Sequence, residues 1–420
     1  MSLLLSGSQL VPAKLPELPI ENNLRTIILS DTAVEDIGAL RRARYLDRLL
    51  LCNTLVEDLR PLAALDRLEN LQLDGCTRLR DLGPLRSLKN LQSLTFERTA
   101  VTDASIVDEL PYLRWVRFAV PPPGPFGWVR GLEHLNIAGK SISDLSPLAG
   151  ARRLETLRAA HSGVVDLSPL RELEQLVELD VSHTRVATLD PLVDVWNLRG
   201  LFVAGTAITT LGVARDMWLQ RLDASYTRVD DLGTPQASLR VLRISGTRIG
   251  PVPDLRALQR LRRLDIAHLD QGELDIIAGL QLRALVIAHT GIRDLAPVRH
   301  ELLEWLDLRW SQVRALAQLQ RFARTLKHLA VDVDQAPELA ALAAMQLTHL
   351  TIEGRGTSIV EASWLTKFRH LEELELIDCV LDNAWPLNRL RNLKRLIVPA
   401  TLTADSLVAL QALRPTLRIN

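Results

Sequence analysis

A unit of about 22 residues recurs along this chain, and it constrains the fold more than any other feature of the sequence. Each copy follows the pattern Leu-x-x-Leu-x-Leu-x-x-Thr-x-Val-x-Asp-Leu-x-Pro-Leu, and successive copies are 19 to 24 residues apart. The eighteen copies begin at Leu24, Leu46, Leu68, Leu91, Leu113, Leu132, Leu154, Leu176, Leu198, Leu219, Leu239, Leu261, Leu282, Leu303, Leu326, Leu347, Leu371 and Leu393. Because a repeat buries its apolar side against its neighbours, the pattern predicts one elongated solenoid.

The first half of each unit predicts a short strand. In Leu-x-x-Leu-x-Leu the apolar residues alternate with period two, so the second and third leucines face inward and the residues between them face outward. The second half, for example 144–148 or 166–170, carries Asp and then Pro, which favour the start of a short helical or 3-10 segment. Stacked units therefore predict a long parallel sheet on one side and short helical turns on the other.

This pattern resembles the leucine-rich repeat family, and its Asp-Leu-x-Pro-Leu ending resembles the bacterial internalin type. One well-matched copy contains Leu46, Leu49, Leu51, Thr54, Val56, Asp58, Leu59, Pro61 and Leu62. The resemblance implies an α/β solenoid shaped as a horseshoe or arc, with a concave parallel β-sheet and short helical or 3-10 segments on the convex side. It also implies a surface for binding proteins, although the fold alone does not name a partner.

The repeat register divides the chain into three parts. We expect a partial N-terminal repeat over 1–23, the repeat array over 24–416, and the start of a terminal strand over 417–420. The repeat at 113–131 is irregular, because Pro121 to Pro123 and Pro125 cannot donate sheet hydrogen bonds or continue a helix. It is either a tolerated insertion or deletion, or a bend or partner-contacting loop. No capping turn is recognisable at either end, so the ends are blunted by local side chains, stack on another copy, or continue into a longer protein.

Composition limits the classes of binding partner and the cellular compartment that we expect for this chain. Lys plus Arg equals Asp plus Glu at 50 each, so the chain lacks the basic excess that favours nucleic acid or anionic membranes. No apolar run approaches the roughly 18 residues of a membrane span, and the first residues do not resemble a signal peptide. Three cysteines are too few and too scattered for a disulfide framework. We therefore expect a cytoplasmic protein, with export by a specialised system left open.

The position eight residues after each first leucine is mostly Thr or Ser, where the family usually carries Asn. Members of this ladder include Thr32, Thr54, Thr99, Ser162, Thr184, Thr206, Thr227, Thr247, Thr290, Ser311 and Thr401. A hydroxyl is small enough to bury and can both donate and accept, so we expect it to bond the backbone of a neighbouring turn. Leu269, Asp334 and Arg355 interrupt the ladder, which predicts a less regular C-terminal third.

Three outward-facing columns on the predicted sheet are candidate binding surfaces. The first consists of small residues: Ala119, Ala138, Ala160, Ser182, Ala204, Ser225, Ser245, Ala267 and Ala288. They form either a recognition trough or simply relieve crowding between strands. The second, mid-strand column is Arg158, Asp180, Phe202, Asp223, Arg243, Asp265, Val286 and Asp307, in which opposite charges are expected to lie side by side. Aspartate is unfavourable in strands and Phe202 has no evident folding role there, so both suggest binding.

The third column, the rim, contains four of the nine histidines of the chain. Its members are His161, His183, Gly205, Tyr226, Gly246, His268, His289 and Trp310. Two histidines in adjacent turns do not make a metal site, so a rim of polar aromatic residues is favoured over metal binding. Trp305, Arg309 and Trp310 are expected to lie together as an anchor, because Trp and Arg dominate interface hot spots. The predicted protein-binding residues are Arg158, Asp180, Phe202, Asp223, Tyr226, Arg243, Asp265, His268, His289, Trp305, Asp307, Arg309 and Trp310.

These features favour a non-catalytic scaffold or adaptor that binds a protein on its concave face. No catalytic residue, cofactor or metal is predicted, because the sequence lacks a phosphate-binding loop, a His-Glu-x-x-His motif and paired cysteines at zinc spacing. One alternative is the recognition arm of a secreted effector or larger sensor that targets a host protein. Another is a structural element that self-associates through its uncapped ends.

Overall fold

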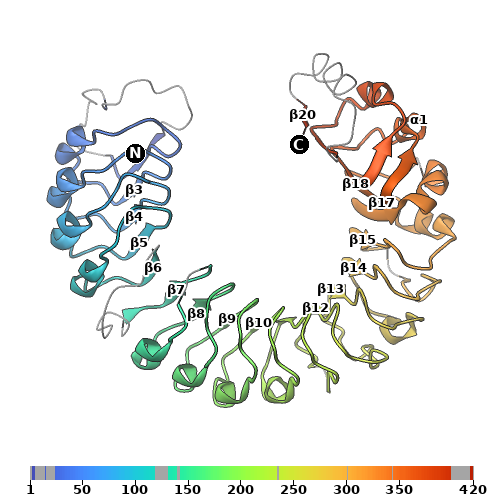
Figure 1. Cartoon of the computed structure of the whole chain (residues 1–420), viewed down its shortest axis with the longest axis horizontal. Coiled ribbons are helices and arrows are strands. Elements are labelled where there is room, and N and C mark those ends of the chain that lie inside the picture. Colours follow the sequence, from blue (N-terminus) through green and yellow to red (C-terminus); the bar gives the residue numbers. More distant parts are fainter. Residues whose placement is uncertain are drawn as a thin grey trace. The chain divides into compact units, whose positions relative to one another are not determined.

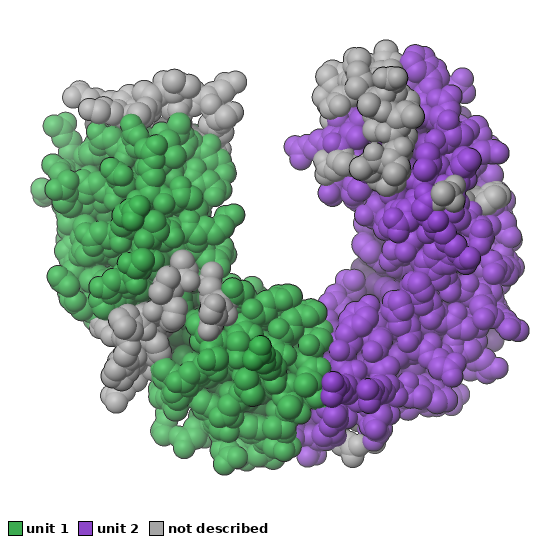
Figure 2. All heavy atoms as spheres, in the orientation of Figure 1, with its two compact units in different colours: residues 1–208 green, residues 209–420 purple. Residues whose placement is uncertain are grey.

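The computed structural model describes two compact units, Met1–Ile208 and Thr209–Asn420 (Figure 2). It describes residues 2–4, 15, 24–118, 131–139, 142–233, 236–299, 301–342, 344–398 and 417–419. In each unit the strands follow one another in chain order, and the 3-10 turns lie along the opposite side (Figure 1). Among these described residues, no helix is both long enough and apolar enough to cross a bilayer.

Unit 1 stacks short strands that pair in parallel. They are β1 (Ser2–Leu4), β2 (Thr26–Ile28), β3 (Arg48–Leu50), β4 (Asn70–Gln72), β5 (Ser93–Phe96), β6 (Trp115–Phe118), β7 (His134–Asn136), β8 (Thr156–Arg158), β9 (Glu178–Asp180) and β10 (Gly200–Phe202). From β2 onward each begins two residues after the first leucine of a repeat. The strand predicted by the alternating leucines is therefore confirmed in every repeat of this unit.

Unit 2 continues the same pattern with longer strands near its end. Its strands are β11 (Arg221–Asp223), β12 (Val241–Arg243), β13 (Arg263–Asp265), β14 (Ala284–Val286), β15 (Trp305–Asp307), β16 (His328–Asp332), β17 (His349–Val360), β18 (Glu373–Leu381), β19 (Arg395–Ile397) and β20 (Arg418–Ile419). Those from β11 to β20 also pair in parallel. Each unit thus has the predicted parallel sheet.

The inward leucines form the core because neighbouring strands are in register. Leu49 lies opposite Leu71 in unit 1, and Leu264 lies opposite Leu285 in unit 2. All four are 0% exposed. Since a fully buried leucine contributes about 1.5–3 kcal/mol relative to an exposed one, these rows hold the turns together.

The side opposite the strands consists mainly of 3-10 segments, as the Asp-Leu-x-Pro-Leu ending predicts. In unit 1 these are η1 (Gly38–Arg42), η2 (Arg60–Ala64), η3 (Gly83–Ser87), η4 (Ser105–Glu109), η6 (Ser146–Gly150), η7 (Ser168–Leu170) and η8 (Asp190–Leu192). In unit 2 they are η9 (Gly212–Asp216), η10 (Asp275–Ile277), η11 (Leu316–Phe322), η12 (Val333–Leu342) and η13 (Trp385–Arg389), beside one α-helix, α1 (Ala362–Leu365).

The repeat aspartate lies one position before the N-cap residue of its 3-10 segment and is not itself the N-cap. The N-cap residue is the leucine that follows it, such as Leu167 before η7, and the aspartate lies one position earlier. Asp166 accepts a hydrogen bond from the backbone N–H of Ser168 at 2.8 Å, and Asp144 accepts one from Ser146 at the same distance. The side-chain hydroxyls of Ser168 and Ser146, and after them these backbone N–H groups, lower the pKa of the two carboxyls, because hydrogen bonds stabilise the charged form.

The hydroxyl ladder bonds within its own turn, which corrects the expectation of a bond to the neighbouring turn's backbone. Thr184 Oγ1 donates to the carbonyl of Val181 at 2.6 Å, three residues earlier in the chain. The same bond recurs in other repeats, at Thr32, Thr54, Thr99, Ser162, Thr206, Thr227, Thr247 and Thr290. The hydroxyl therefore closes the bend after the strand, where a short side chain reaches its own backbone more easily than another turn. Thr401 lies outside the described residues.

The C-terminal third is less regular, as the interrupted ladder predicts. Strand β17 spans 12 residues and shifts register against β18 between Glu353 and Ser358. The turn at η12 is 10 residues long. At the interrupted ladder positions, Leu269 is buried whereas Asp334 and Arg355 are exposed. A charged residue there cannot take the buried place of the threonine, so the chain follows a wider path.

Candidate functional site

The mid-strand aspartates have a structural role that sequence reasoning missed. Asp180 accepts a hydrogen bond from the backbone N–H of Ser182 at 3.0 Å, two residues further along. Asp223, Asp265 and Asp307 make the same bond at 3.1–3.2 Å. A carboxylate at this position satisfies an N–H that the outward side of the strand end leaves free. Aspartate in these strands is thus explained without a partner.

Only part of the predicted charge alternation becomes ion pairs. In unit 2, Arg243 Nη1 lies 3.2 Å from Asp223 Oδ2, as expected. In unit 1, Arg158 faces Asp180 in the strand register, but its guanidinium pairs with Glu178 at 3.4 Å instead. Phe202, at the end of β10, is half-buried. Burial raises the pKa of Asp265, which has no ion pair within 4 Å in the described part of unit 2.

In unit 2 the column of small residues does not form an exposed trough floor. Ser225, Ser245, Ala267 and Ala288 are only 3–5% exposed. Ser245 Oγ donates to Ser225 Oγ at 3.1 Å, so these side chains contact one another across adjacent turns. The steric explanation therefore fits this unit, and a partner would meet the mid-strand and rim side chains first. Ala119 and the proline-rich segment 121–126 lie outside the described residues.

The rim residues occupy a left-handed turn. His161, His183, Tyr226, His268, His289 and Trp310 have φ between 55° and 58°, and Gly205 and Gly246 have 65° and 63°. Glycine adopts this conformation readily, and histidine is enriched there among other residues. In most of these turns the N–H continues the sheet, as where His161 donates to the carbonyl of Ser182 at 2.8 Å, whereas the N–H of Trp310 donates to the carboxylate of Asp332 at 3.2 Å. The histidine content of the rim therefore reflects backbone geometry in part.

The rim side chains stack on one another within each unit. The His161 and His183 rings are 4.4 Å apart, and the His268 and His289 rings are 4.2 Å apart. The rim glycines accommodate the preceding ring, because a Cβ on Gly205 would clash with the His183 ring and one on Gly246 would lie 2.6 Å from the Tyr226 ring. Among the described residues no group of three His, Cys, Asp or Glu side chains could hold a metal. Each pair of histidines forms a polar aromatic edge within its own unit.

A tryptophan–arginine cluster stands at the end of β15 in unit 2, and we define it as Asp307, Arg309, Trp310, Glu353 and Arg355. Arg309 bonds Asp307 and Glu353, each at 2.8 Å. The Asp307 carboxylate, more than Glu353, raises the pKa of the Arg309 guanidinium. The guanidinium carbon of Arg355 lies 4.9 Å from the centre of the Trp310 ring, a cation–π contact. Sequence reasoning identified three of the five residues and missed Glu353 and Arg355, which the irregular β17 supplies.

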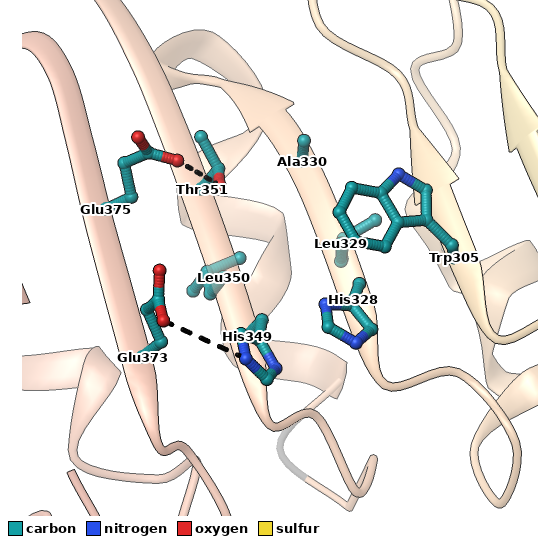
Figure 3. A pocket seen from close by; sticks show the side chains of 9 residues that line it. All are labelled: Trp305, His328, Leu329, Ala330, His349, Leu350, Thr351, Glu373 and Glu375. Carbon is teal, nitrogen blue, oxygen red and sulfur yellow. Dashed lines mark hydrogen bonds and ion pairs between the residues drawn. The ribbon is translucent and has the colours of Figure 1, made fainter. Parts of the chain in front are cut away.

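Trp305 does not join this cluster, which corrects the expected grouping of Trp305 with Trp310. It lies at the start of β15, five residues before Trp310 along the chain, and its ring stacks on His328 at 4.5 Å. His328 in turn stacks on His349 at 4.0 Å. This second set borders a small hollow between β15 and β18 (Figure 3). Trp305, His328 and His349 each lie two residues after the first leucine of their repeat. Aligning the repeats at this position could have revealed the set from the sequence.

Stacked parallel strands joined by 3-10 turns define a solenoid repeat protein. No protein family and no curated protein matches the chain. The ectodomain of a membrane receptor kinase of Arabidopsis thaliana, solved with CASPARIAN STRIP INTEGRITY FACTOR 2, is similar, with a TM-score of 0.54 and 15% identity over 94% of this chain and 58% of that one. The fold is therefore that of a leucine-rich repeat protein.

Two bacterial structures are also similar. An internalin of Listeria monocytogenes is 22% identical over 68% of this chain and 74% of its own, with a TM-score of 0.43. A leucine-rich repeat protein of Leptospira interrogans is 16% identical over 94% and 84%, with a TM-score of 0.46.

Proposed function

We propose that this chain is a non-catalytic interaction protein that binds a partner protein on its strand face, centred on the tryptophan–arginine cluster of unit 2. The cluster itself is the observation that carries this proposal. It places a tryptophan and two arginines on one edge of the sheet, with Arg309 already held in place by two carboxylates. Such preorganised Trp and Arg side chains lose little conformational freedom on binding and are the residues most often found at interface hot spots.

The fold supports the same conclusion. A parallel sheet of short strands offers a long, open row of side chains, which suits a protein surface better than a metabolite. The similar plant ectodomain was solved in complex with a named factor, so a receptor of this fold binds a ligand.

A binding role also agrees with the hydrogen bonds and ion pairs that the carboxylates of the strand face make within the protein. Asp223, Asp265 and Asp307 each accept a backbone N–H bond from their own strand end. Asp223 and Asp307 in addition pair with arginines. Carboxylates committed in this way are poorly placed to move protons in a reaction.

The three free cysteines, two of them buried, fit the proposed cytoplasmic location.

The decisive experiment compares three baits in a lysate of the source organism. The wild type is compared with the double variant Trp310→Ala, Arg355→Ala and with Trp385→Ala, an exposed tryptophan on the 3-10 side of unit 2. A partner should be retained by the wild type and by Trp385→Ala and be lost from the double variant. Removing two hot-spot residues costs about 2 kcal/mol or more each, or roughly 30-fold in affinity per residue.

Trp310→Ala keeps a non-glycine residue at φ 58°, so the backbone preference of this turn is unchanged. Equal thermal unfolding of the three proteins would show that the variants remain folded. Retention of the same partners by all three baits would contradict the proposed site and direct attention to the 3-10 side.

A further inference from the structure

A hollow of about 90 Å³ opens between strands β15, β16, β17 and β18, and Trp305, at the start of β15, lines it (Figure 3). The six side chains that matter for its chemistry are Trp305, His328, His349, Thr351, Glu373 and Glu375. Since one water takes about 30 Å³, the hollow has room for about three waters or one small planar group.

One wall of the hollow is aromatic. Trp305, His328 and His349 come from the same position of three successive repeats, and their rings stack at 4.5 and 4.0 Å. Arg263 lies beyond the stack, with its guanidinium carbon 5.9 Å from the centre of the Trp305 ring. The stack holds the rings in place, so the wall is preorganised rather than formed by a ligand.

The opposite wall is acidic. Glu373 and Glu375 alternate along β18, so their side chains leave the same face of the strand (Figure 3). Glu373 is compensated by Arg395 at 3.4 Å and lies 3.9 Å from the His349 ring. Glu375 accepts a hydrogen bond from the hydroxyl of Thr351 at 3.0 Å and has no ion-pair partner among the described residues. The hollow thus carries a negative charge that no described residue neutralises through an ion pair.

We propose that this hollow receives an arginine side chain of the bound partner protein. The inference rests on the proposed protein-binding function and specifies the chemistry of one contact. A guanidinium is planar and cationic, and it can donate two hydrogen bonds to a carboxylate while its plane lies against an aromatic ring. Glu375 supplies the carboxylate, and Trp305 with His328 supplies the aromatic surface.

Other occupants fit the hollow less well. An anionic side chain would face two carboxylates, and an apolar one would leave Glu375 without a cation while excluding water from it. No set of three ligands for a metal exists among the described residues, so a cation held only by coordination is disfavoured. Both histidines stand on the aromatic wall, and burial lowers the pKa of His328, which keeps that ring neutral near pH 7.5.

The test uses blocked tripeptides, acetyl-Gly-Arg-Gly-amide and its citrulline counterpart, titrated into full-length protein at pH 7.5. Citrulline has nearly the shape of arginine but no charge, so it isolates the ionic contribution. Ring signals of ¹³C-labelled histidine report binding, with His328 and His349 assigned from His328→Gln and His349→Gln. The arginine peptide should shift both rings with saturation near roughly 1 mM, and the citrulline peptide should not.

Glu375→Gln should weaken binding of the arginine peptide by about tenfold or more, because it removes the charge while keeping the shape. The matched control is Glu372→Gln. Glu372 belongs to the same repeat but pairs with Lys394 at 2.7 Å and does not line the hollow. Equal shifts with both peptides, or unchanged binding to Glu375→Gln, would overturn the proposal. Because no partner protein takes part, that result would leave the test of the tryptophan–arginine cluster unaffected.

Discussion

At the scale of single residues, the ladder hydroxyl shows how a buried polar group stabilises each turn. Thr184 is 7% exposed and donates to Val181 within its own repeat. Replacing Thr184 by Val keeps the shape but removes this bond, so we expect a loss of about 1–2 kcal/mol in the free energy of unfolding. Denaturation in urea, followed by circular dichroism, measures it.

Thr156→Val on strand β8 is the matched control for Thr184→Val. Thr156 lies on the outward side of its strand and is half-buried. Valine suits a strand as well as threonine does, so the change should be within about 0.5 kcal/mol. An equal effect of both substitutions would show that the ladder bond does not contribute to stability.

We expect Gly205 to be needed for two reasons: its φ is left-handed, and the His183 ring occupies the space where a Cβ would lie. A methyl group on Gly205 would clash with His183 Nδ1, whereas one on Gly139, with φ 69°, would meet no atom of the described residues within 4 Å. Gly139→Ala should therefore cost about 1–2 kcal/mol from the left-handed backbone alone. Gly205→Ala should cost more, and His183→Ala should remove the excess.

Unfolding in urea gives all three values for this comparison of rim glycines. If Gly139→Ala and Gly205→Ala destabilise the protein equally, the His183 ring moves aside easily and the rim is less rigid than its stacking indicates.

At the scale of elements, the sequence predicts nearly all strands but few details of the surface between them. The leucine spacing gives the start of each strand from β2 to β19. Leucines that alternate with polar residues can all be buried only if the segment is a strand in that register. The rim and mid-strand residues were harder to interpret. Their apparent binding signals, His in the rim and Asp in the strands, arise in part from a left-handed turn and from free N–H groups, and neither is visible in a pattern of apolar residues.

The tryptophan–arginine cluster shows the same limit. Arg309 and Trp310 follow from the register of their own repeat, but Glu353 and Arg355 come from two repeats further on, where β17 departs from the pattern. A residue in an irregular repeat cannot be assigned to a column by counting. The contacts that complete the cluster therefore required the structure.

The ring stacks of unit 2 predict sensitivity to mild acid. The pKa values of His289 and His328 are lowered from 6.5, first by burial and then by a neighbouring histidine. The folded protein therefore binds these protons less readily than the unfolded chain, so stability is complete above about pH 6.5 and falls as the pH drops below it. Urea denaturation at pH 7.5 and 5.5 should show a lower free energy of unfolding at pH 5.5.

The acid effect is separable from that of the repeat aspartates, whose pKa values are lowered. Asp144 and Asp166 have pKa values below 3.8, so the stability they contribute is lost only at a lower pH. The double variant His289→Gln, His328→Gln should lose less stability between pH 7.5 and 5.5 than the wild type does. An unchanged loss in this variant would assign the acid sensitivity to other groups.

At the scale of the whole molecule, the cysteines provide one internal probe for each unit. Cys76 in unit 1 and Cys379 in unit 2 are both 0% exposed, whereas Cys52 is half-buried. Burial raises the pKa of all three thiols, and that of Cys379 reaches about 11. In native protein at pH 8 we expect one thiol to react with a maleimide before the other two.

Mass spectrometry after digestion identifies which cysteine has reacted. Cys52 should be labelled first, and low concentrations of urea should expose Cys76 and Cys379 as their own units open. Labelling of Cys76 as fast as Cys52 in buffer alone would show that the core of unit 1 opens readily. Different urea dependences for Cys76 and Cys379 would show that the two units open separately.

The ladder bond has a consequence for how such a chain changes over generations. Because each hydroxyl donates to a carbonyl of the same repeat, a whole repeat that is duplicated or lost by unequal recombination takes both partners of that bond with it. The strands on either side can then pair again in the same register. Length is thus a property that this architecture can alter in steps of one repeat, without first having to invent a new interaction.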